Sequence, residues 1–176
     1  MKMILILSIA CLMHLVPVQP DISEKVIVQF KIANAGFDVK GSLDIVKAEI
    51  KFDPRNLKES HIHAVADPAS IQTGISVRDK HLRRSDYFDV SRYPQIILKS
   101  TGITKNGRLN YIGEFDLTIK GITKSITILF TLKQQNDLST YNATFEVNRL
   151  DFELGESSTL LDNTVTISVQ VQETIQ

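Results

Sequence analysis

The sequence has few of the residues on which covalent, metal and cofactor chemistry usually depends. It contains one cysteine, Cys11, and no tryptophan among 176 residues, so an internal disulfide is excluded. Lysine plus arginine equals aspartate plus glutamate at 20 each, so the total charge offers no excess for binding a polyanion such as nucleic acid. The sequence contains no GxSxG nucleophile elbow, HExxH zinc helix or glycine-rich phosphate loop. We therefore expect no catalytic residue, cofactor or metal, and a protein that is not an enzyme.

A long apolar run occurs only at the N-terminus, in MKMILILSIACLMHLVPVQP. Lys2 is its only charge, and Pro17 ends a run that is shorter than the ~20 apolar residues of a membrane-spanning helix. This pattern is typical of a signal peptide, with an uncleaved N-terminal anchor as the alternative. We predict a signal peptide at residues 1–20 and one mature domain at residues 21–176, which is periplasmic or secreted and has no cysteine.

The rest of the chain alternates apolar and polar residues, a pattern typical of strands with one buried face. In VTISVQVQETI, the aliphatic residues from Val165 to Val171 alternate with polar ones. Asn106-Gly107 and Gly121 mark tight turns between such segments. The pattern predicts eight strands, near residues 24–34, 42–53, 60–67, 93–104, 109–119, 126–132, 140–150 and 165–175.

Eight antiparallel strands can form a sandwich or a closed barrel. Hairpins that follow one another along the chain favour the barrel, which has no exposed edge and can be wide enough for one small ligand. Alternation does not distinguish a packed interior from a lipid-sized cavity, and both remain open at this point. The residues expected to point inward are Phe30, Ile32, Phe37, Leu43, Ile45, Tyr111, Phe115, Leu117, Phe130, Phe145, Val147 and Ile167.

Residues 70–101 are rich in charge and interrupt the strand pattern. Ser76 and Asp79 have the spacing of a capping box, which predicts a short helical connection near residues 77–90. Its basic residues are interleaved with acidic ones, so a solvated helix face is favoured over a nucleic-acid contact. Asp79 and His81 are two residues apart and do not face each other on a helix, which argues against a catalytic dyad.

His61 and His63 lie two residues apart on a predicted strand and therefore on the same side of it. Such a pair could ligate a metal, but no third ligand is evident in the sequence. Two histidines on one exposed strand face are the favoured interpretation, and we expect no metal site.

The charged stretch and its surroundings resemble the YceI-like family of bacterial exported proteins. The resemblance is carried by SIQT, VRDKHLRRSDYFDVSRYPQIILKST and DLTIKGITKSITI, and more weakly by GFDVKGSLDIVKAEIKFDP and VNRLDFELG. It implies a lipocalin-like, extended eight-stranded antiparallel barrel that binds a long isoprenoid or similar amphiphilic lipid in the periplasm, often as a homodimer. It also implies that Arg78 and Asp79 hold a loop at the barrel mouth, and that Leu82, Tyr87 and Phe88 pack against the barrel or its ligand.

The chain departs from the family pattern at several positions. It has no tryptophan, Asn34 stands where a histidine is common, and Leu98 replaces a usual phenylalanine. These differences affect the expected ligand and cavity depth more than the expected fold. The alternative function is a filled barrel that acts as a structural or stress-related module for binding a partner.

Overall fold

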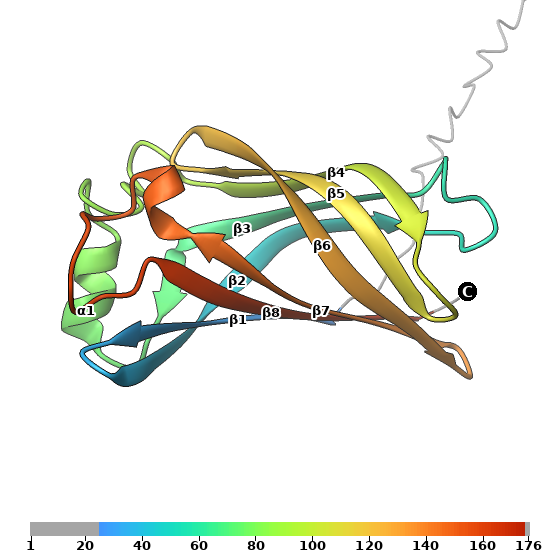
Figure 1. Ribbon diagram of the computed structural model, residues 1–176, viewed down its shortest axis with the longest axis horizontal. Helices are drawn as coiled ribbons and strands as arrows, with labels where there is room; N and C mark the ends of the chain where they lie inside the picture. The colour runs from blue at the N-terminus through green and yellow to red at the C-terminus, as the bar shows by residue number, and fades with distance from the viewer. Residues whose placement is uncertain (1–24, 175–176) are drawn as a thin grey trace, which may run out of the picture.

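The computed structural model describes residues 25–174, which form one elongated closed barrel of eight antiparallel strands (Figure 1). Each strand pairs with the next along the chain, and β1 pairs with β8 to complete the wall. The expected fold class and its eight strands are confirmed, whereas the signal peptide expected at residues 1–20 lies outside the described residues. The strands are β1 (Lys25–Asn34), β2 (Phe37–Lys51), β3 (His61–Gln72), β4 (Ile96–Lys105), β5 (Asn110–Ile119), β6 (Ile122–Gln135), β7 (Leu138–Asn148) and β8 (Thr164–Thr174).

Alternation and turn chemistry explain this architecture. In β8, the aliphatic side chains of the alternating run line the interior, while Ser168 between them is exposed. Ala35-Gly36 joins β1 to β2, and Lys120-Gly121 joins β5 to β6. Both residues of each pair have positive φ, 51° and 81° in the first turn and 51° and 76° in the second. Positive φ at both central residues suits the right-handed twist of a tight hairpin.

The helical connection is shorter than expected. Helix α1 spans Ser76–Leu82, and turns rather than helix carry the chain from there toward β4. The predicted capping box is wrong, because Ile75 occupies the N-cap and no side chain caps the helix. Asp79 is instead buried, and its carboxylate accepts hydrogen bonds from the backbone N–H (2.9 Å) and hydroxyl (2.5 Å) of Thr73.

The two ends of the barrel are built differently. Helix α1 lies at one end, called here the mouth, together with a short 3-10 helix, η1 (Arg149–Phe152) (Figure 1). The connection between β2 and β3, residues 52–60, lies at the opposite end (Figure 1). Within residues 25–174, no helix has the length and apolar character needed to span a membrane.

Candidate functional site: an apolar cavity inside the barrel

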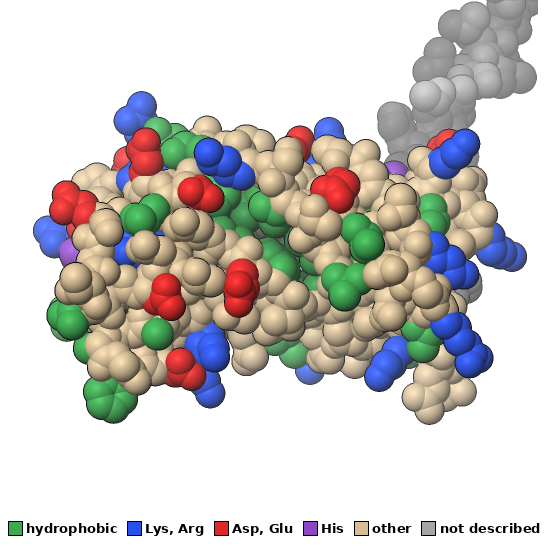
Figure 2. Space-filling view, viewed as in Figure 1, with side chains coloured by type: hydrophobic (Ala, Val, Ile, Leu, Met, Phe, Trp, Pro, Cys, Tyr) green, Lys and Arg blue, Asp and Glu red, His purple; other side chains and the backbone are tan. Residues whose placement is uncertain are grey.

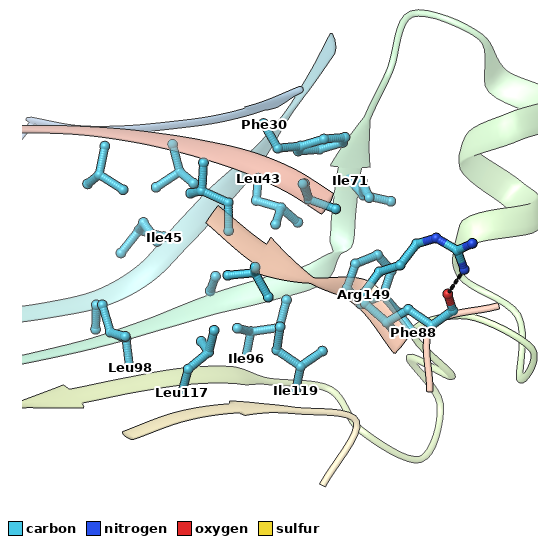
Figure 3. A pocket seen from close by; sticks show the side chains of 18 of the residues that line it. Phe30, Leu43, Ile45, Ile71, Phe88, Ile96, Leu98, Leu117, Ile119 and Arg149 are labelled. Carbon is cyan, nitrogen blue, oxygen red and sulfur yellow. Dashed lines mark hydrogen bonds between the residues drawn. The ribbon is translucent and has the colours of Figure 1, made fainter. Parts of the chain in front are cut away.

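A cavity of about 440 Å³ runs inside the barrel and reaches the mouth (Figure 3). All strands except β6 contribute side chains to it, and nearly all of these are apolar. Alanines on neighbouring strands, Ala48 on β2 with Ala64 and Ala66 on β3, leave room in the wall for an occupant. Such a lining favours a hydrocarbon chain over a polar substrate, because it offers few hydrogen-bond partners.

Aromatic residues close the end opposite the mouth. The ring of Phe52, from the connection between β2 and β3, makes edge contacts with Tyr111, Phe130 and Tyr141 at centroid distances of 4.9, 5.7 and 5.8 Å. We call these four residues the aromatic plug. Their connection is held in place by Asp53, whose backbone N–H donates to the hydroxyl of Ser60 (2.9 Å). The barrel is therefore filled at this end and hollow beyond it.

The mouth brings together most of the polar side chains that border the cavity. Arg78 donates from Nε to the hydroxyl of Thr73 (2.7 Å) and from Nη2 to its carbonyl oxygen (2.9 Å). Thr73 in turn donates its hydroxyl hydrogen to Asp79, so the three side chains form one chain of hydrogen bonds. This arrangement holds helix α1 against the end of β3.

Arg149 is the second cation at the mouth, and it is only 3% exposed. Its guanidinium donates to backbone carbonyl oxygens of the loop before β8, at Leu154 (2.8 Å), Glu156 (2.7 Å) and Asp162 (2.9 Å). Figure 3 draws one hydrogen bond of Arg149 as a dashed line. Among the described residues, no ion pair joins Arg149 to a carboxylate. Carbonyl dipoles satisfy its hydrogen bonds but leave its positive charge without a neutralising anion.

Eleven of the fifteen residues predicted to bind lipid border the cavity. Figure 3 labels five of them. They are Phe30, Ile32, Leu43, Ile45, Leu82, Tyr87, Phe88, Leu117, Phe145, Val147 and Ile167.

Phe37 does not point into the barrel, although its position in the alternation suggested this. It is paired with Asn34 at the tip of the hairpin between β1 and β2, and its side chain is 77% exposed. The hairpin extends past the rim at this point, so an inward direction no longer leads into the interior.

Three other predicted residues are inside the barrel but outside the cavity lining. Tyr111 and Phe130 are buried in the aromatic plug at 3% and 4% exposure, so they fill the interior where a cavity was expected. Phe115 folds over Gly113, where an added Cβ would lie only 2.3 Å from its ring. The space beside Gly113, which has no side chain, is therefore occupied by the ring of Phe115.

Some cavity residues were missed by the prediction. Ile96 and Leu98 on β4 and Val169 and Val171 on β8 continue an alternation that the sequence already shows. The alanines of β3, Ala64 and Ala66, follow the same period and were also missed. Thr73 could not have been found in this way, since its role depends on a contact with Asp79 across a turn.

The histidines do not assemble a reactive or metal-binding cluster in the described part of the chain. His81 Nε2 lies 3.2 Å from Asp86, whereas Asp79 is bonded to Thr73, so the two members of the suspected dyad have different partners. His61 Nε2 lies 3.5 Å from Glu49. Residues 25–174 contain no group of three side chains that could hold a metal ion.

Comparison with known proteins agrees with this geometry. A model of the YceI-like domain matches residues 20–173. The chain belongs to the YceI-like family. A UPF0312 protein of Vibrio parahaemolyticus is 35% identical over 104 residues, which cover 57% of this chain and 54% of that protein. The match thus spans about half the length of this YceI-like relative.

Solved structures share the fold. The crystal structure of Burkholderia cenocepacia BcnA is 23% identical with a TM-score of 0.80, and the match covers 84% of this YceI-like chain and 95% of BcnA. A polyisoprenoid binding domain from Saccharophagus degradans, implicated in plant cell wall breakdown, is 12% identical with a TM-score of 0.65, covering 86% and 94%. At these identities the likeness concerns the fold.

Proposed function

We propose that this YceI-like protein binds one long-chain isoprenoid or a similar amphiphilic lipid inside its barrel, without catalysis. The observation that carries the proposal is a cavity of about 440 Å³ that is apolar along its walls, closed by the aromatic plug and bordered by arginines at its mouth. The tail of the lipid lies between the strands, and its polar head lies beside Arg78 and Arg149. The polyisoprenoid-binding domain of the same fold supports this ligand class.

Burial of the hydrocarbon tail supplies most of the binding free energy. A chain methylene fills about the same space as a water, ~30 Å³, so the cavity of about 440 Å³ holds roughly 15 chain carbons. Each buried methylene contributes about 0.8 kcal/mol, a gross gain on the order of 10 kcal/mol before the costs of association. The positive charge of Arg149, which no carboxylate neutralises among the described residues, favours an anionic head group.

The N-terminal segment and the family favour a place outside the cytoplasm. A basic residue followed by a short apolar run is typical of exported chains, and we propose a periplasmic or secreted protein that holds or carries its lipid there. A filled-barrel partner-binding module is not favoured, because only the plug end of the barrel is filled.

Mass spectrometry of lipids extracted from the gently purified protein tests the proposal. We expect a long-chain lipid in near-stoichiometric amount from the native protein and much less of it from Ala64→Phe, in which a ring takes up part of the cavity. Recovery of the same lipid in equal amount from both proteins would mean that it binds elsewhere.

A further inference from the structure

The barrel wall is not hydrogen-bonded along its whole circumference. Strands β6 and β7 pair only from Phe130↔Ala143 to Gln135↔Leu138. On their other sides both strands are paired much further, β6 with β5 as far as Ile122 and β7 with β8 as far as Asn148. Two facing strand edges, residues 122–129 of β6 and 144–148 of β7, therefore have no partner strand in the described structure. We call this region the seam.

The seam lies beside the cavity rather than beside the plug. The paired part of β6 and β7 contains the plug residues Phe130 and Tyr141. The part of β7 that does not pair with β6 contains Phe145 and Val147, both of which line the cavity. The wall is thus closed by hydrogen bonds where the interior is packed and opens where the interior is hollow.

Side chains along the seam leave an apolar hollow at the surface. Figure 2 shows a depression with hydrophobic side chains at its floor on the face where β6 and β7 run. Ile126 and Phe145 are both only half-buried and pack against the same cluster, and Leu129 on the adjoining edge is about half exposed. Phe152 of η1 is buried in that cluster and closes the part of the seam nearest the mouth.

Lys124 gives a second sign that the wall is open here. It pairs with Leu117, whose side chain lines the cavity, and paired residues of antiparallel strands point to the same side of the sheet. Lys124 therefore has an inward-facing position, yet it is exposed. An exposed lysine at such a position is expected where the next strand is missing.

We propose that the seam is a side opening through which the far end of a bound chain leaves the barrel. This inference rests on the lipid-binding function proposed above and concerns chains longer than the cavity, with more than roughly 15 carbons. Such a chain enters at the mouth, meets the aromatic plug, and turns out between β6 and β7. Helix α1 and the loop that Arg149 holds flank the mouth, where the head group lies, whereas no described segment covers the middle of the seam.

A fluorescence-quenching experiment on the full chain tests the opening. In a Cys11→Ser background, which has no other cysteine, single cysteines are introduced and labelled with bimane. Thr144→Cys reports on the β7 edge of the seam, and Leu129→Cys reports independently on the β6 edge. Gln29→Cys is the matched control, because Gln29 is an exposed position beside cavity-lining residues in a wall paired on both sides. Displacement of cis-parinaric acid, a fatty acid whose fluorescence rises in an apolar site, reports separately on lipid binding by the unlabelled Cys11→Ser protein.

The quencher is stearic acid that carries a nitroxide either near its methyl end or near its carboxyl group. We expect the methyl-end nitroxide to quench the two seam labels several-fold more than the Gln29→Cys label, and more than the carboxyl-end nitroxide does. Displacement of cis-parinaric acid from the unlabelled protein by this stearic acid, together with equal, weak quenching at the seam and control positions, would overturn the side opening and leave lipid binding intact. Absence of cis-parinaric acid binding by the unlabelled protein would overturn lipid binding and the side opening with it.

Discussion

One aromatic side chain added inside the cavity should weaken lipid binding strongly without harming the fold. Ala64 lines the cavity from β3 and lies between Ala48 and Leu98, which line it from the two neighbouring strands. In Ala64→Phe the added ring occupies about the space of four chain methylenes, at ~30 Å³ each. The ligand then loses about 3 kcal/mol at ~0.8 kcal/mol per methylene, which is roughly a 100-fold rise in Kd.

The assay is a titration with cis-parinaric acid, whose fluorescence rises in an apolar site, together with urea unfolding. Ala69→Phe is the matched control, since it makes the same substitution at an exposed position of the same strand. We expect the control to bind as the native protein does. If Ala64→Phe bound cis-parinaric acid as well as the native protein does while remaining folded, the ligand could not occupy this cavity.

Three further predictions concern the parts that frame the cavity. Phe52→Ala should lower the free energy of unfolding by about 2–3 kcal/mol in urea titration, less than a fully buried phenylalanine because Phe52 is only partly buried; a change below about 0.5 kcal/mol would contradict its role in the plug. Arg149→Met should lower the free energy of unfolding by more than about 3 kcal/mol, since several loop carbonyls lose their donor. Arg149→Lys should recover little of this stability, and full recovery would show that the positive charge alone matters. Burial raises the pKa of Glu173, and its hydrogen bond from Tyr141 offsets this only in part. The folded state therefore favours the protonated form of Glu173, which stabilises the protein below pH 4.5, and this stabilisation is lost as pH rises through the higher folded-state pKa. Glu173→Gln should therefore have a higher free energy of unfolding than the native protein at pH 7 but not at pH 4. An equal gain in the free energy of unfolding at both pH values would contradict this.

Strand positions were predictable because one face of each strand is apolar along most of its length. The alternation from Val165 to Val171 reproduces β8, and the turn at Gly121 marks the β5–β6 hairpin. The helix was harder, since the spacing of Ser76 and Asp79 suits a capping box but also allows the bond that Asp79 makes to Thr73. A local pattern does not decide between a partner within the helix and one in the preceding loop.

The cavity could not be predicted from alternation, because a packed core and a hollow one present the same inward residues. What separates them is the position of each residue along the barrel axis. Tyr111 and Phe130 fill the interior because Phe52 folds in from a connection to meet them, and that contact has no sequence pattern of its own. Phe37 shows the same limit at the opposite end, where the hairpin extends beyond the rim.

A crystal structure with a brominated long-chain fatty acid would show whether a lipid chain enters the barrel, because bromine is located by its anomalous scattering. With bromine in the first half of the chain, we expect a peak inside the barrel, among Leu98, Phe145 and Ile167. A peak only on the outer surface, with the cavity free of the chain, would contradict the claim that this barrel is a lipid-binding site.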